Sequence, residues 1–234
     1  MKIKIKSKIT YLYRHIFPKN LRIFFRKLIK FFYYKFRFIN LKLNLIFTKK
    51  YVNLIIGAAL TKQKGWFSTN EEWLDIAREN HWNRLFNSKK RVKKILAEHV
   101  FEHLSLQEMR SALKLIYENM IFGGSLRVAV PDGNNPNLEY RKNCGINGIG
   151  ADAADHKQFI TFELFRKEAL KVGFEVKLIE GYKKNKQLIS EEFDYDLGYV
   201  IRSRRNIKNI FSKEGWNFPD ANTSLIVDCF KLTN

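Results

Sequence analysis

The sequence is poor in cysteine and has no long apolar run, and each shortage excludes a class of protein. Two cysteines, Cys144 and Cys229, cannot form a disulfide framework and lack the paired spacing of a zinc site. Charged residues interrupt every apolar stretch before the roughly 20 residues that a membrane-spanning helix requires. The basic start is not followed by the apolar core and cleavage segment of a secretion signal. We therefore expect a cytoplasmic chain with reduced thiols that does not cross a membrane.

Acidic residues are absent from positions 1–50, which hold 11 lysines and four arginines. The rest of the 234-residue chain has 28 basic and 23 acidic side chains, so most of the net charge of +20 belongs to this leader. The charge therefore says little about what the remainder binds. We expect two regions, a leader at 1–50 and a single domain with its own core at 51–234.

Residues 21–39 of the leader separate apolar from basic side chains on a helical wheel. The apolar half holds Leu21, Phe24, Phe25, Leu28, Ile29, Phe31, Phe32, Phe36, Phe38 and Ile39. The basic half holds Arg22, Arg26, Lys27, Lys30 and Arg37. This pattern favours a helix at 19–41 that binds an anionic membrane surface peripherally, on the inner face of the membrane. Packing of the apolar half on the domain or on a partner is the alternative, and nucleic acid is the partner least favoured.

Beyond Tyr51 the pattern alternates between apolar runs typical of strands and segments with helical spacing. Strands are expected at 52–57, 66–69, 91–99, 125–131, 174–180 and 224–230, and a strand or turn at 73–76. Ser105 and Glu108 form a capping box that begins a helix, and Gly123 and Gly124 are expected to end it. A second helix is expected at 156–172, a loop at 133–152 and a polar insertion with little regular structure at about 181–223. The alternation predicts a Rossmann-like, doubly wound, mostly parallel α/β sheet with ligands at the carboxyl ends of its strands.

Seven blocks of sequence follow one another from residue 54 to residue 231. They are LIIGAALTKQKGW (54–66), WLDI (73–76), ILAEHVFEHL (95–104), GGSLRVAVPDG (123–133), DHK (155–157), RSRR (202–205) and TSLIVDCFK (223–231). In this order the blocks resemble a class I S-adenosylmethionine-dependent methyltransferase, in particular the short bacterial, type 11-like group often met in surface-sugar gene clusters. The resemblance implies S-adenosylmethionine as cofactor and an antiparallel last strand.

The resemblance also implies a cofactor site. Gly57 and Ala59 would approach the methionine part of the cofactor, and Asn70 with Glu71 would contact its ribose. Asp75 would flank the adenine, and Glu98 would face the cofactor at the end of the fourth strand. Two positions depart from the family pattern. Alanine stands at 59 where a second glycine is typical, and asparagine at 70 replaces an acid, which removes a charge-assisted bond to the ribose diol.

Three histidines are the candidates for a general base. Methyl transfer is an in-line displacement that positioning promotes, and a base with a pKa near neutrality assists a hydroxyl acceptor. His99, His103 and His156 are placed for that role, with Asp155 as an orienting group. If residues 99–103 do not turn helically, only one of the first two can reach the acceptor, and His99 is preferred.

Four residues are expected to contact the acceptor, a small molecule that the resemblance implies to be sugar-linked. They are Asp132, Asp155, Arg204 and Arg205. Residues 99–103 also match the inverted zincin pattern H-x-x-E-H, but they follow a strand instead of lying inside a helix, so we expect no metal site.

The expected function is methyl transfer from S-adenosylmethionine to a small-molecule acceptor, such as a sugar or a surface-glycan precursor. Two alternatives remain open. One is a catalytically degenerate, methyltransferase-like module that binds its ligand without turnover. The other is a membrane-peripheral protein of a glycan pathway in which the leader is the main functional element.

Overall fold

The computed structural model describes residues 18–48, 51–59, 61–87, 89, 91–150, 153–192, 194–200 and 223–232. The chain divides into two compact units, Met1–Phe47 and Thr48–Asn234. Two of the expected acceptor contacts, Arg204 and Arg205, lie outside the described residues.

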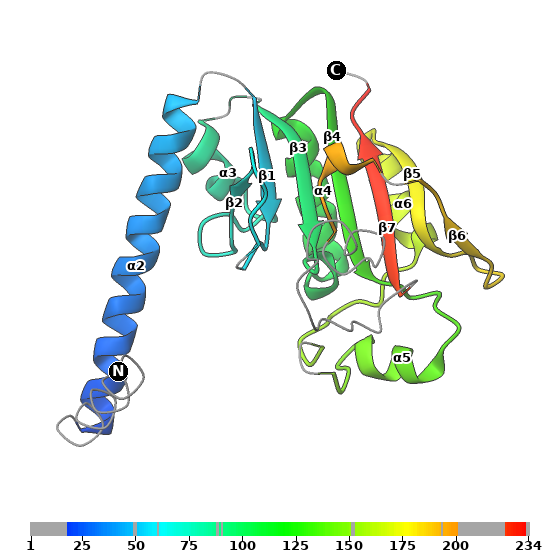
Figure 1. Cartoon of the computed structure of the whole chain (residues 1–234), viewed down its shortest axis with the longest axis horizontal. Coiled ribbons are helices and arrows are strands. Elements are labelled where there is room, and N and C mark those ends of the chain that lie inside the picture. The colour runs from blue at the N-terminus through cyan, green and yellow to red at the C-terminus, as the bar shows by residue number, and fades with distance from the viewer. Residues whose placement is uncertain are drawn as a thin grey trace, which may run out of the picture. The chain divides into compact units, whose positions relative to one another are not determined.

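The first unit contains one long described helix, α2 (Lys19–Phe47) (Figure 1). It extends the helix expected at 19–41 by six residues. Large aromatic side chains along it are exposed, including Phe24, Phe31, Phe32 and Phe36. Across the part of the chain that the structure describes, no helix combines the length and the apolar character needed to cross a membrane.

The second unit is built on a twisted sheet to which the described residues contribute seven strands in the order β2-β1-β3-β4-β7-β5-β6 (Figure 1). The strands are β1 (Val52–Ile56), β2 (Phe67–Ser68), β3 (Val92–Glu98), β4 (Met120–Pro131), β5 (Glu175–Tyr182), β6 (Leu188–Ser190) and β7 (Ser224–Phe230). The first four strands pair in parallel, whereas β7 lies antiparallel between β4 and β5. The predicted fold class, a Rossmann-like and mostly parallel sheet with an antiparallel last strand, is therefore confirmed.

Local sequence explains the helices of this unit. These are α3 (Glu79–Phe86), α4 (Leu106–Asn119), α5 (Leu138–Cys144) and α6 (Phe162–Val172), with 3-10 turns η1 (Phe101–His103) and η2 (Tyr195–Leu197). The predicted capping box is present: Ser105 Oγ accepts from Glu108 N–H, and Glu108 Oε2 accepts from Ser105 N–H. Helices α4 and α6 lie side by side on one face of the sheet (Figure 1).

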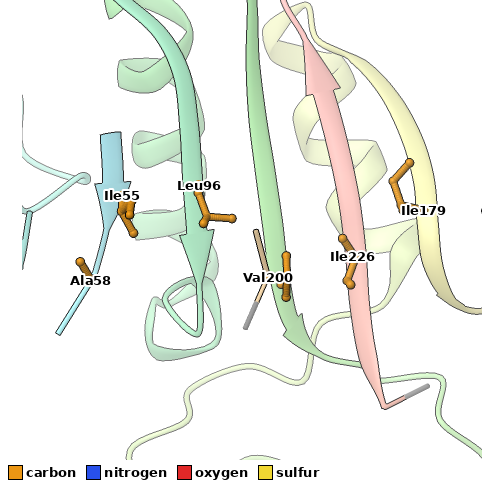
Figure 2. Close-up of a cluster of buried hydrophobic side chains, with 7 residues drawn as sticks. Ile55, Ala58, Leu96, Ile179, Val200 and Ile226 are labelled. Carbon is orange, nitrogen blue, oxygen red and sulfur yellow. The ribbon is translucent and has the colours of Figure 1, made fainter. Parts of the chain in front are cut away.

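The opposite face is covered by the short segment that follows β6. Figure 2 shows a row of apolar side chains drawn from successive strands, with Val200 packed against them. The cluster consists of Ile55, Ala58, Leu96, Ala129, Ile179, Val200 and Ile226, with Trp66 at its edge. Because side chains alternate between the faces of a strand, this row is distinct from the residues that face α4 and α6.

A buried ion pair holds this segment to the sheet. Arg127 on β4 is directly opposite Asp228 on β7, and its Nε and Nη2 donate to the two carboxylate oxygens at 2.7 Å each. Its Nη1 donates to the carbonyl oxygens of Asp194 and Gly198, again at 2.7 Å. The guanidinium thereby joins two strands to the segment that covers them, at a site with no exposure to solvent.

Several boundaries differ from the sequence-based expectations. Helix α4 ends at Asn119 and β4 begins at Met120, so Gly123 and Gly124 lie inside a strand. Gly123 has a φ of +72°, and the register of β3 against β4 shifts beside it. Residues 73–76 form a turn without a strand.

Regular structure also forms where loops were expected. Helix α5 lies in the expected loop at 133–152 because the Asn137 side chain caps its first turn. The described part of the expected insertion at 181–223 contains the end of β5, all of β6 and η2. Helix α6 starts at Phe162, where Thr161 caps it, instead of at residue 156.

Candidate functional site

The strand order creates a switch point between β1 and β3. From β1 the chain passes to its neighbour β2 on one side, and then returns to β3 on the other side (Figure 1). In open α/β sheets, ligands bind outside the carboxyl ends of the strands at such a point. The segments that flank it here are residues 57–59, after β1, and residues 99–105, after β3.

The turn after β1 adopts the conformation of a glycine turn at both expected positions. Gly57 has a φ of +61° and Ala59 a φ of +47°. Glycine adopts this left-handed conformation readily and other residues adopt it rarely, so Ala59 has the backbone that a glycine at this position would have. Two hydrogen bonds fix it: Ala58 N–H donates to Thr69 O, and Ala59 N–H donates to Asn70 Oδ1, both at 2.9 Å.

Gly57 also meets the segment after β3. A Cβ placed on Gly57 would lie 2.5 Å from Val100 Cγ2. Any larger side chain at this position therefore disturbs packing between the two segments. Packing against Val100 is a constraint that the glycine pattern alone did not indicate.

The other expected cofactor contacts lie in different surroundings. Asn70 reaches the turn with its Oδ1, and Glu71 beside it is exposed. Asp75 instead belongs to a local turn, in which it accepts from Ala77 N–H and pairs with Arg78 at 2.8 Å. Glu98 is half-buried at the end of β3. The structure thus brings Gly57, Ala59 and Asn70 together.

The three candidate bases gather beyond β3. His99 has a φ of +54°, which turns the chain sharply out of the strand and into η1. Its Nδ1 lies 2.7 Å from Oε1 of Glu102, whose side chain is only 1% exposed. The His103 ring packs edge-on against the His156 ring with 4.8 Å between centroids. Residues 101–103 do turn helically, and the turn carries His103 to His156 and Glu102 to His99.

His156 comes from a distant part of the chain that backbone hydrogen bonds tie to η1. The N–H groups of Lys157 and Gln158 both donate to the carbonyl oxygen of Glu102, at 2.8 and 3.1 Å. The imidazole Nδ1 of His156 lies 2.9 Å from the carbonyl oxygen of Cys144. These contacts occupy the N–H groups of residues 157 and 158 outside any helix, and α6 begins at Phe162.

Two of the expected acceptor contacts, Asp155 and Asp132, differ in their exposure to solvent. Asp155 is largely exposed, and its Oδ1 lies 3.1 Å from His103 Nδ1. Asp132 is fully buried, and its two oxygens accept from Asn134 N–H at 2.7 Å and from Tyr182 N–H at 2.6 Å. Burial raises the pKa of the Asp132 carboxyl despite these bonds. Asp132 therefore joins the end of β4 to β5 in the interior.

Glu102 is the residue that the sequence reasoning missed. It lies inside the H-x-x-E-H block, but its neighbours gave no sign that it would be buried among three histidines. Within the described residues, neither of its carboxylate oxygens receives a hydrogen bond. The sequence signal that could have found it is the second acid of ILAEHVFEHL (95–104), four residues after Glu98.

Comparisons with known proteins give structural neighbours only. No family model matches the chain, and no curated protein matches it. The structure is similar to a methyltransferase dependent on S-adenosylmethionine from Thermotoga maritima, with a TM-score of 0.44 and 16% identity over 90% of this chain and 99% of the other. A similar enzyme from Archaeoglobus fulgidus has a TM-score of 0.41 and 16% identity over 86% of this chain and 97% of that one. One from Methanosarcina mazei has a TM-score of 0.41 and 12% identity, covering 80% and 95%. These identities are low, so any assignment of activity rests on the residues of this chain.

Proposed function

We propose that the chain binds S-adenosylmethionine beside the turn after β1 and transfers its methyl group to a small-molecule acceptor held beyond β3. One observation carries the proposal. The glycine-type turn at 57–59, anchored by Asn70, lies at the switch point of the sheet and faces the histidine-bearing segment after β3. A ligand bound there lies within reach of both segments, as in-line methyl transfer requires.

The polar groups of the two segments suit different parts of the reaction. The turn after β1 offers backbone and the Asn70 amide, which can hydrogen-bond a ribose hydroxyl without adding charge. The segment after β3 offers His99, paired with buried Glu102, as the base for a hydroxyl acceptor.

Calorimetric titration of S-adenosylmethionine and S-adenosylhomocysteine into the full chain tests the proposal. We expect both to bind, and Gly57→Ala to abolish binding. Because the new Cβ of Gly57→Ala also clashes with the Val100 side chain, the double variant Gly57→Ala/Val100→Ala is the matched control for packing. If the double variant regains both its melting temperature and its affinity, the turn is needed only for packing, and the cofactor lies elsewhere.

Asn70 provides a second and milder test. Asn70→Asp keeps an oxygen for Ala59 N–H and adds a charged oxygen for the ribose diol, so we expect tighter binding. Asn70→Ala loses the bond that fixes the turn and should weaken binding. Equal affinity in all three proteins would show that the ribose does not contact this position, and Glu71 would be the next candidate.

We propose a sugar or surface-glycan precursor as the acceptor, on the family resemblance alone. Nucleotide sugars and glycan fragments are therefore the first compounds to screen for methylated product. His99→Ala should then lower turnover by roughly 10²–10⁴, with cofactor affinity little changed. Cofactor binding without a product from any acceptor would favour the degenerate binding module.

We propose in addition that residues 19–41 bind an anionic membrane surface. The support is the row of exposed aromatic side chains on α2 together with the absence of acidic residues from positions 1–50. The full chain should sediment with phosphatidylglycerol vesicles and not with phosphatidylcholine vesicles, and salt should weaken the binding. Phe32→Ser/Phe36→Ser should release it, whereas Leu138→Ser, which alters an exposed residue of the other unit, should not. Equal sedimentation of all these proteins would exclude this surface.

A further inference from the structure

The segment after β3 and the segment before α6 bring together side chains that are common metal ligands. One potential ligand atom from each of Glu102, His103 and His156 lies within 4.8 Å of the others. Glu102 and His156 are buried, and His103 is partly exposed. The three residues are separated in sequence, but the hydrogen bonds from Lys157 and Gln158 to the Glu102 carbonyl hold their segments together.

Three buried atoms of this cluster lack hydrogen bonds in the described part of the chain. They are both carboxylate oxygens of Glu102 and Nδ1 of His103. Two ion-pair contacts lie close to them: His99 Nδ1 is 2.7 Å from Glu102 Oε1, and Asp155 Oδ1 is 3.1 Å from His103 Nδ1. A buried polar atom without a hydrogen bond costs about 1–3 kcal/mol, and more when it is charged. A cluster of such atoms is stable in a folded protein when something else satisfies it.

The third ring is already oriented for a ligand. His156 directs Nδ1 at the Cys144 carbonyl oxygen, 2.9 Å away, so this nitrogen carries the proton and donates. In a neutral imidazole with this tautomer, the other ring nitrogen, Nε2, carries the lone pair. Metal-binding histidines usually donate their second nitrogen to a carbonyl or carboxylate in this way, which fixes the tautomer and the ring orientation.

We propose that Glu102, His103 and His156 bind a divalent transition-metal ion of the zinc type. Two imidazoles and one carboxylate form the protein ligand set of catalytic zinc and of several iron sites. Zinc–ligand distances of roughly 2.0–2.2 Å require the ligand atoms to lie closer together than 4.8 Å, so the three side chains would move inward when the ion binds. His99 holds one oxygen of Glu102 at 2.7 Å and leaves the other oxygen for the ion.

This site goes beyond the proposed methyl transfer and departs from the sequence-based expectation of no metal. That expectation considered only an inverted zincin helix, whereas the structure adds a ligand from residue 156. Three protein ligands leave a fourth position for water or substrate. An acceptor with a hydroxyl group could occupy that position beside the cofactor turn, and the ion would then fix its oxygen.

Metal binding can be measured on the full chain without any methyl transfer. Protein freed of metal by a chelator is titrated with Zn²⁺ by calorimetry and with Co²⁺ by visible absorption. We expect one equivalent of ion, with the intense cobalt bands of a low-coordinate site. Glu102→Gln, His103→Gln and His156→Gln should each weaken binding by more than about 100-fold, and His99→Gln by about tenfold because it acts through Glu102.

The control is His81→Gln, which removes a histidine of α3 whose ring bonds Asp75 N–H. It should bind cobalt as the wild type does. Glu102→Gln is the decisive variant because it keeps the side-chain volume and removes a buried charge, so it should fold, as circular dichroism and melting will show. Wild-type protein that takes up no cobalt overturns the proposal. Folded Glu102→Gln protein that binds like the wild type overturns it as well.

Discussion

Two of the buried charged side chains in the described residues, Arg127 and Glu102, are partnered differently. In the sheet, Arg127 has no exposure and makes four hydrogen bonds of 2.7 Å to Asp228 and to two carbonyl oxygens. At the carboxyl edge, Glu102 is 1% exposed and receives no hydrogen bond from the described residues. A buried charge with complete partners holds a fold together, whereas one with incomplete partners marks a site where something else binds.

The largest effect is expected when Arg127, one partner of the fully hydrogen-bonded Arg127–Asp228 pair, is removed. Arg127→Leu should lower the free energy of unfolding by about 3–5 kcal/mol, because it leaves the Asp228 carboxylate buried without a counter-charge. Urea denaturation of the full chain measures the loss. The double variant Arg127→Leu/Asp228→Leu should recover most of it. If the double variant is as unstable as Arg127→Leu, the loss of stability comes from the segment at 194–200 that Arg127 holds, and not from the unpaired charge of Asp228.

Glu168 on α6 is an intermediate case, a buried carboxylate with partners at the surface. Hydrogen bonds from Arg110 and then Lys171 lower the pKa of Glu168 to about 2 from its ordinary value of 4.5. Since the folded pKa lies below the unfolded one, the stabilisation is complete above about pH 4.5 and is lost as the pH falls towards 2. Glu168→Gln should therefore cost about 1–3 kcal/mol at neutral pH.

Thermal melts of the wild type and of Glu168→Gln at descending pH measure this loss. The difference between wild type and Glu168→Gln should shrink as the pH falls through the acid range. Lys114→Gln, which removes an exposed pair with Glu118 at 3.8 Å, should change stability by less than about 0.5 kcal/mol at every pH. A constant Glu168 difference down to acid pH would mean that packing, and not charge, explains the loss.

Of the three buried charges Arg127, Glu168 and Glu102, the last is expected to affect stability least. In metal-free protein, Glu102→Gln should change the free energy of unfolding by less than about 1 kcal/mol or raise it, because it removes a buried charge that lacks hydrogen bonds. Urea denaturation of Glu102→Gln and of Arg127→Leu under the same conditions measures the two changes in the free energy of unfolding. A loss as large as that of Arg127→Leu would place Glu102 among the residues that hold the fold, and the contrast between the two places would fail.

Strands and caps were predictable because their signals are local. Runs such as 52–57 and 224–230 are apolar over a strand length, and Ser105 with Glu108 makes a cap from residues three apart. The start of β4 at Met120 was not predictable, since pairing with β3 and a bulge at Gly123 override the helical spacing before it. Tertiary pairing decides such boundaries.

The candidate site likewise has one part that the local sequence predicts and another part that it does not. The turn at Gly57 follows directly from its strand, and both its position and its conformation agree with the sequence pattern. The meeting of His103 with His156 depends on hydrogen bonds between segments far apart in sequence, which no local pattern encodes. Burial of Asp132 and Glu102 likewise depends on what the loops cover. Their roles therefore became visible only once the chain was folded.

The position of β7 has a consequence for synthesis on the ribosome. Residues 224–230 form the strand that lies between β4 and β5, and without them these two strands have no partner on their facing edges. A nascent chain emerges from its amino end, so β4 and the β5–β6 hairpin expose those edges until the last strand appears. Unpaired strand edges invite contacts with other chains. The nascent chain should therefore need protection by chaperones until residues 224–230 have left the ribosome, and stalling ahead of residue 224 should trap an aggregation-prone half-sheet.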